Sequence, residues 1–163
     1  MKTLYLLRHA KSSWEDISLE DYERPLLNKG IKRAKNVASH LLERGDRPEL
    51  IISSHAVRAY ETARIFAKKL NYPEKEIVID ENLYFSGSEA MENLVYSVSD
   101  KIERLMLVGH NPDMTNFANI FLSNKLDYIP TSGLVCITFE TDKWQEIMVA
   151  KRDIPFVIIP KKR

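Results

Sequence analysis

The chain alternates short apolar runs, rich in Leu, Ile and Val, with longer segments in which apolar residues recur at helical spacing. Apolar runs of roughly 4–8 residues are typical of buried strands, whereas a period of about 3.6 indicates an amphipathic helix. The runs predict strands at residues 3–7, 50–53, 77–79, 105–108 and 134–140. The periodic segments predict helices at residues 28–44, 56–70, 88–97 and 112–122. Such alternation of strands and helices indicates an α/β protein with a mainly parallel sheet.

The C-terminal part of the chain departs from this alternation. Residues 134–140 and 144–151 flank the short segment 141–143, and they predict an antiparallel hairpin that makes the sheet mixed. Two prolines and a basic end predict a loose tail over residues 155–163. We therefore expect one α/β domain over residues 1–163.

Composition narrows the class of protein. The 163 residues are 44% hydrophobic, enough to bury a core, and 24 basic against 23 acidic residues leave a formal net charge of +1. That balance argues against non-specific binding of nucleic acid. No apolar run approaches the ~20 residues of a membrane span, and no signal peptide is evident. Because Cys136 is the only cysteine, no internal disulfide can form, and we expect a cytoplasmic protein.

Chemically active side chains follow three of the predicted parallel strands. Arg8 and His9 end the first strand, Arg58 lies just beyond the second, and His110 follows the fourth. Ligands of open α/β sheets bind outside the carboxyl ends of the strands, so we expect these side chains in one crevice. Arg58 falls in the first turn of its helix, where a cation is unfavourable unless an anion binds there.

This set of side chains suits phosphoryl transfer. A neutral histidine that is held by a hydrogen bond on one ring nitrogen presents the other as a nucleophile, and we assign this role to His9. Arg8 and Arg58 would bind the phosphoryl oxygens, and a protonated His110 would add a third donor. The scheme needs neither a metal ion nor a cofactor.

Four segments in chain order resemble one known family. Residues 8–14, RHAKSSW, resemble the Arg-His-Gly signature of the histidine phosphatase superfamily, which includes the phosphoglycerate mutases. The Pro-Leu…Gly pattern at 25–30 and the Ser…Arg-Ala…Thr-Ala pattern at 54–63 are similar to its next two elements. Residues 108–112, VGHNP, resemble the second-histidine block of its short branch, the SixA-like phosphohistidine phosphatases.

This resemblance implies a phosphoglycerate mutase-like fold, a three-layer α/β/α sandwich whose mixed sheet carries one antiparallel strand. It implies that His9 is the phosphorylated nucleophile and that Arg8, Arg58 and His110 form the phosphate pocket. The substrate would be phosphohistidine on a protein or a small phosphorylated molecule. Ala10 stands where the superfamily usually has Gly, so either the backbone there is not at positive φ or the turn differs.

Three further residues are compatible with a role in the site or a structural role. Segment 80–84 resembles the one that carries the proton-donating Glu of the mutases, which makes Glu81 a candidate general acid or a solvated turn residue. Ser12 is either a phosphate ligand or a turn residue. His55 either lines the pocket beside Arg58 or shapes the turn from strand to helix.

Other functions compete with a metal-independent phosphatase. A catalytically weak module could bind a phosphorylated partner without turnover. The string at 109–111 suggests a metal-dependent phosphoesterase, but no Asp-x-His follows the first strand, and no His-Glu-x-x-His motif or cysteine pair occurs elsewhere. Mutase activity is less favoured, because the chain between residues 70 and 105 has no long segment that could close as a lid. An open site fits a macromolecular substrate.

Overall fold

The computed structural model describes residues 1–161, and within them six strands form one sheet in the order β3-β2-β4-β1-β5-β6. The strands are β1 (Lys2–Arg8), β2 (Leu50–Ser53), β3 (Val78–Ile79), β4 (Arg104–Gly109), β5 (Leu134–Phe139) and β6 (Arg152–Ile158). The first four are parallel to one another, whereas β5 is antiparallel to both of its neighbours. The predicted α/β class and the mixed, mainly parallel sheet are confirmed.

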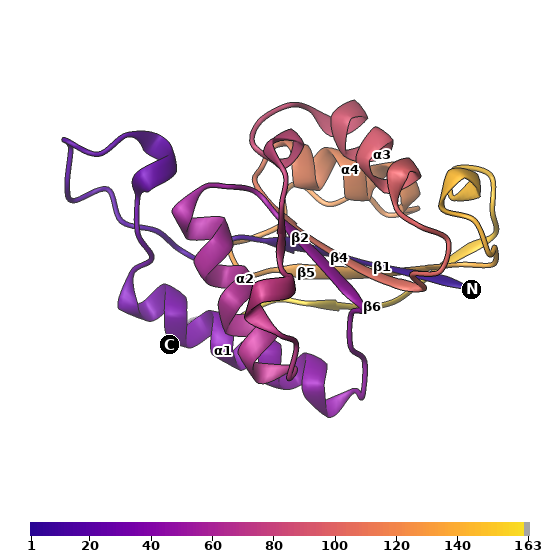
Figure 1. Cartoon of the computed structure of the whole chain (residues 1–163), viewed down its shortest axis with the longest axis horizontal. Coiled ribbons are helices and arrows are strands. Elements are labelled where there is room, and N and C mark those ends of the chain that lie inside the picture. The colour runs from indigo at the N-terminus through magenta and orange to yellow at the C-terminus, as the bar shows by residue number, and fades with distance from the viewer. Residues whose placement is uncertain (162–163) are drawn as a thin grey trace.

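The helices cover both faces of this sheet. One face carries α1 (Asn28–Glu43) and α2 (Val57–Lys69), and the other carries α3 (Ser88–Ser97) and α4 (Asp113–Phe121) (Figure 1). Short 3-10 turns lie in the connections: η1 (Asp21–Glu23), η2 (Glu74–Glu76), η3 (Glu81–Leu83) and η4 (Trp144–Glu146). The three-layer sandwich is thus confirmed. Within residues 1–161, none of the helices has the length and apolar character needed to cross a membrane.

The sheet buries one core on each face, because successive side chains of a strand point to opposite faces. Leu4 and Leu6 of β1 pack with α3 and α4, whereas Tyr5 and Leu7 pack with α1 and α2. All four side chains are fully buried. A strand that is covered on both faces has no polar side to alternate with, which explains why the sequence shows continuous apolar runs.

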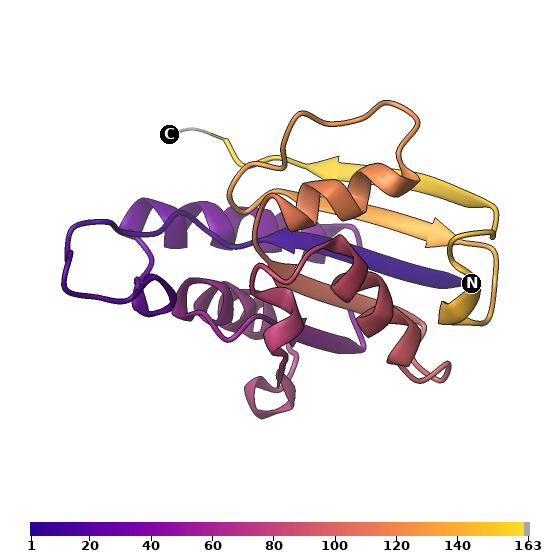
Figure 2. The same cartoon turned by 90° about the horizontal axis from the view of Figure 1, so that it is seen from above.

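The register of the parallel strands brings three carboxyl ends to one edge of the sheet. Arg8 at the end of β1 lies opposite Gly109 at the end of β4, and Ser53 at the end of β2 lies opposite Val108. The long loop that follows β1 extends beyond this edge (Figure 2). The chain therefore presents its strand-end residues to a common space.

The C-terminal hairpin differs from the prediction. Its second strand is β6, not residues 144–151, which form η4 and an irregular connection. The side chain of Trp144 is fully buried in the core beneath α3 and α4, and its Nε1–H donates to the carbonyl oxygen of Ile102 at 2.8 Å. This contact holds the connection against the core. The apolar residues of the segment alone do not distinguish such a connection from a strand.

The prediction of a loose tail over residues 155–163 was wrong for its first part, because Pro155 and the residues up to Ile158 belong to β6. The register between β5 and β6 shifts between Cys136 and Thr138, which marks a bulge. Proline is tolerated at bulges of edge strands, where its missing N–H interrupts no central ladder. The last two residues of the tail lie outside the described part of the chain.

The first turn of α1 has no space for a side chain at Gly30. A Cβ at this position would lie 2.3 Å from the carbonyl oxygen of Lys11. Helix propensity alone favours Ala over Gly by ~1 kcal/mol. The backbone clash outweighs this gain, and we expect Gly30→Ala to lower the free energy of unfolding by about 1–3 kcal/mol. Urea denaturation measures this change in the free energy of unfolding. Asn36→Ala, on the exposed side of α1, is the control. A Gly30→Ala protein that is more stable than the wild type would contradict the close contact.

Candidate active site

A cleft of about 360 Å³ opens at the edge of the sheet where β1, β2 and β4 end. It is lined by Arg8, His9, Ser12, Arg58 and His110, all of which are candidates predicted from the sequence. Two larger cavities, of about 810 and 700 Å³, lie beside α1, but neither is lined by these residues. The chemistry of the lining, not the size of the cavity, makes the smaller cleft the candidate site.

His9 follows β1 directly and is only 7% exposed. Its Nδ1 lies 2.7 Å from the carbonyl oxygen of Ala10, so Nδ1 carries the proton and donates it, and the lone pair is on Nε2. Burial and then the charges of Arg58, Arg8 and Arg24 lower the pKa of His9 to about 3, although the bond to Ala10 opposes this. The result is a neutral imidazole with one fixed tautomer, which can act as a nucleophile.

Ala10 ties the end of β1 to α2. Its N–H donates to Thr62 Oγ1 at 2.9 Å, and that hydroxyl donates to the carbonyl oxygen of Arg58 at 2.7 Å. The Ala10 side chain is fully buried between the sheet and the helices α1 and α2. Its φ is not positive, so a Cβ causes no strain where the superfamily usually has Gly.

His110 follows β4 and is 1% exposed. Its Nε2 lies 2.8 Å from Ser54 Oγ, which accepts the N–H of Ala56 and has its own hydroxyl proton to donate to the ring. When Ser54 is the donor, the ring proton is on Nδ1; in either tautomer Nδ1 is buried without a hydrogen-bond partner. Burial, followed by His9 and Arg58, lowers the pKa of His110 to about 2. The ring is therefore neutral, whereas a protonated donor was expected; an anion in the cleft would favour the charged form.

Arg58 and Arg8 are buried cations whose hydrogen-bonding capacity is only partly used. Arg58 lies in the first turn of α2 and is 1% exposed. Arg8 donates from Nη1 to the carbonyl oxygen of Ile129 at 3.0 Å, and the Nε atoms of both arginines are buried without a partner. Together with His110 Nδ1, three buried nitrogens of residues that line this cleft lack a hydrogen-bond partner. Buried donors are nearly always paired in folded proteins, so this arrangement indicates an oxyanion ligand.

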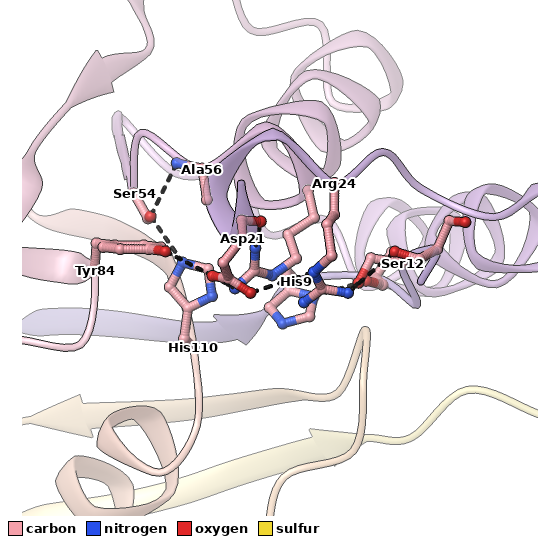
Figure 3. A network of polar contacts seen from close by, with 11 residues as sticks. His9, Ser12, Asp21, Arg24, Ser54, Ala56, Tyr84 and His110 are labelled. Carbon is pink, nitrogen blue, oxygen red and sulfur yellow. Dashed lines mark hydrogen bonds and ion pairs between the residues drawn. The ribbon is translucent and has the colours of Figure 1, made fainter. Parts of the chain in front are cut away.

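Asp21 and Arg24 also line the cleft; the sequence places residues 14–24 at its rim but assigns neither residue a role. Asp21 Oδ2 lies 2.9 Å from Arg58 Nη2 and accepts the Tyr84 hydroxyl at 2.6 Å (Figure 3). Arg24 donates from Nη1 to Ser12 Oγ at 2.9 Å and from Nε to Asp21 Oδ1 at 3.2 Å. Partial desolvation raises the pKa of Asp21, but the bonds from Tyr84 and Arg58 and the charges of both arginines outweigh it and lower the pKa to about 2.

The other candidates take different positions. Ser12 lines the cleft and is 9% exposed. Glu81 is exposed on η3 and does not line the cleft; from the same segment, the Tyr84 hydroxyl donates to Asp21, which does line it. His55 lies beside the cleft, between the rings of Tyr22 and Tyr84, with centroid distances of 6.0 and 4.7 Å. The sequence signal that Asp21 and Arg24 carry is their closeness to Pro25-Leu26: Arg24 directly precedes Pro25, and Asp21 lies four positions before it.

The charge of the cleft suits an anion. Arg8, Arg24 and Arg58 surround it, against the single negative charge of Asp21. Among residues 1–161, no three His, Cys, Asp or Glu side chains lie together as the ligands of one metal ion would.

The buried neutral histidines predict a pH dependence of stability. The folded pKa values of His9 and His110, about 3 and about 2, lie below the ~6.5 of an unfolded histidine. Between these values the unfolded chain binds more protons than the folded protein. The free energy of unfolding therefore falls as the pH decreases from about 6.5, by up to about 1.4 kcal/mol per pH unit for each histidine.

Urea denaturation at several pH values between about 4.5 and 6.5 measures this slope, above the range in which Asp21 contributes. His110→Asn is expected to make the slope shallower, and His40→Asn, which removes an exposed histidine of α1, serves as the control. An unchanged slope in His110→Asn would contradict the neutral, buried ring.

Known proteins share both the sequence pattern and the fold. The model of the histidine phosphatase superfamily (branch 1) matches residues 4–101. An uncharacterized chloroplastic protein of Arabidopsis thaliana is 32% identical over 154 residues, which cover 89% of this chain and 70% of that protein. A crystal structure provisionally described as the phosphohistidine phosphatase SixA from Agrobacterium tumefaciens aligns with a TM-score of 0.83 at 28% identity and covers 98% of each chain. The structure of the protein histidine phosphatase SixA complexed with tungstate has the same fold, with a TM-score of 0.79 at 16% identity over 96% of each chain. The chain therefore belongs to the histidine phosphatase superfamily, in its SixA-like branch.

Proposed function

We propose that this protein is a phosphatase that transfers a phosphoryl group from its substrate to His9 and then to water, without a metal ion. The observation that carries the proposal is the set of three buried nitrogens without hydrogen-bond partners, from Arg8, Arg58 and His110, around a neutral histidine. Membership of the superfamily and the SixA-like fold support a hydrolase of this class.

His9 acts in two steps. In the first, the Nε2 lone pair attacks phosphorus, an N–P bond forms, and the leaving group departs with the electron pair of its own bond. In the second, water attacks the phosphohistidine, phosphate forms, and Nε2 regains its lone pair. The bond from Nδ1–H to the Ala10 carbonyl keeps the ring oriented and stabilises the positive charge that develops on it.

The phosphoryl oxygens are assigned to Arg8, Arg58 and His110, with Ser12 as a further ligand. The rings of His9 and His110 lie 5.1 Å apart between centroids, so a phosphoryl group on the first is close to the second. Donors that are fixed before the reaction stabilise the charge redistributed on these oxygens, which is the main catalytic contribution in phosphoryl transfer.

The proton supply at the cleft favours a substrate with an easily protonated leaving group. Asp21 is the carboxylate that lines the cleft, and its pKa of about 2 keeps it ionised at neutral pH. Glu81 is exposed outside the lining. The imidazole that leaves a phosphohistidine accepts a proton readily, whereas an alkoxide needs a strong general acid. We therefore assign phosphohistidine as the substrate class.

The rim of the cleft supports a protein as the carrier of that phosphohistidine. Trp14 and Phe85 line the cleft, and 73% and 47% of these residues stay exposed. Exposed aromatic side chains around a polar site are typical of surfaces that contact another protein. A small phosphorylated molecule is the alternative substrate.

His9→Ala is expected to lower kcat by at least ~1000-fold, because no other group can take over the attack on phosphorus. Release of phosphate from a phosphohistidine-bearing protein measures it, and mass spectrometry of acid-quenched wild-type enzyme should detect a phosphoryl group on His9. His40→Ala, at an exposed histidine of α1, is the matched control and should keep full activity. Undiminished turnover by His9→Ala would rule out the proposed nucleophile.

Hydrolysis of P–N substrates is expected to be faster than that of P–O substrates by at least ~10-fold, because of the missing strong acid. A phosphohistidine protein and a phosphoserine peptide are compared at equal enzyme concentration, with and without EDTA, which should leave both rates unchanged. Activity that EDTA abolishes and a divalent metal restores would instead indicate a metal-dependent phosphoesterase. Phosphate binding without turnover of either substrate would indicate a recognition module.

A further inference from the structure

A carboxylate of the protein itself contacts two of the three arginines of the cleft. The Asp21 side chain contacts Arg58 Nη2 at 2.9 Å and Arg24 Nε at 3.2 Å, and the Asp21 carbonyl oxygen accepts from Arg58 Nη1 at 2.8 Å. The Tyr84 hydroxyl donates to the same carboxylate at 2.6 Å. Figure 3 shows Asp21 together with Arg24, Tyr84 and both histidines of the site. Both terminal nitrogens of Arg58 are therefore engaged by one residue.

These donors are the ones that a phosphoryl group requires. Arg58 has donors on three nitrogens, and Asp21 contacts two of them, which leaves Nε without a partner. A phosphate dianion beside the Asp21 carboxylate would meet a like charge in a partly desolvated space, where Coulomb repulsion is several times stronger than in water. The Asp21 carboxylate at Nη2 therefore opposes the binding of phosphate at Arg58 unless it moves away, whereas Nη1 is held by the Asp21 main chain.

The loop that carries Asp21 is held in a way that permits this movement. Its base is closed by pairing of Ser12 with Leu26 and by the bond from Ser13 N–H to the Pro25 carbonyl oxygen at 2.8 Å. The Asp21 side chain remains 40% exposed to solvent. The carboxylate can therefore turn to water without opening the base of the loop.

We propose that Asp21 competes with phosphate for Arg58 and Arg24 and thereby limits the affinity of the site for free phosphate. This inference rests on the proposed function, because it assumes that the cleft binds a phosphoryl group. The Asp21 carboxylate then takes the place of the product phosphate at the arginines, so the product is held weakly and leaves the cleft readily. A larger substrate meets the same repulsion but offsets it through further contacts at the rim.

The test compares two variants that each remove one negative charge from the same loop. Asp21→Asn keeps the shape of the side chain and removes the competing charge. Asp16→Asn is the matched control, because Asp16 bonds to Ser18 within the loop and does not line the cleft. Isothermal titration with inorganic phosphate measures Kd, and inhibition of turnover by phosphate measures Ki.

Asp21→Asn is expected to bind phosphate at least ~10-fold more tightly, in both Kd and Ki, whereas Asp16→Asn stays within about twofold of the wild type. Tyr84→Phe, which removes one bond that holds the carboxylate, should tighten binding in the same direction by a smaller factor. Equal or weaker binding by Asp21→Asn overturns the inference; weaker binding would identify Asp21 as a residue that positions Arg58. A fall in kcat at unchanged Kd also overturns it, in favour of proton transfer by Asp21.

Failure of the inference can be told apart from failure of the proposed function. Phosphate binding is measured without turnover, so a wild-type protein that binds phosphate while Asp21→Asn binds it equally contradicts the competition alone. A cleft in which neither protein binds phosphate, together with full activity of His9→Ala, contradicts both. Circular dichroism and the urea midpoint of each variant confirm that the comparison is made between folded proteins.

Discussion

The parallel pairing of β1 and β2 with β4 is the constraint on which the site depends. The ladders continue one residue past the strands, since the His9 N–H donates to the carbonyl oxygen of Gly109 at 3.1 Å and the Ser54 N–H to that of Val108 at 3.0 Å. These bonds bring His9, His110 and Ser54, which contacts the His110 ring, to one edge. A shift of the register by one residue would turn each side chain to the opposite face of the sheet.

Burial then determines the chemistry of the side chains at this edge. It keeps His9 and His110 neutral at physiological pH, although a histidine in water would be partly charged. The arginines cannot lose their charge in the same way, because the guanidinium remains protonated in proteins. A neutral imidazole surrounded by cations with unused donors is the electrostatic complement of a phosphoryl group, which agrees with the histidine phosphatase superfamily to which the chain belongs.

The periodic parts of the chain were predictable because each buried face repeats at a fixed spacing. The helices α1 and α2 follow from apolar residues at helical intervals, and β1 and β4 from continuous apolar runs between two helical layers. Residues 144–151 show the limit of such reasoning. Trp144 is buried by its contacts with the core near Ile102, so its apolar character has no connection with a strand.

Local pattern and strand polarity were sufficient to specify the layers of the fold and the positions of Arg8, His9, Arg58 and His110 at one edge, because parallel strands present their carboxyl ends together. The environment of Arg58 was decided by tertiary contacts. Asp21 is 37 positions from Arg58 and 63 from Tyr84, in a loop without periodicity. The conformation of such a loop is set by contacts with distant segments. Its carboxylate could therefore be assigned to the cleft only after the chain was folded.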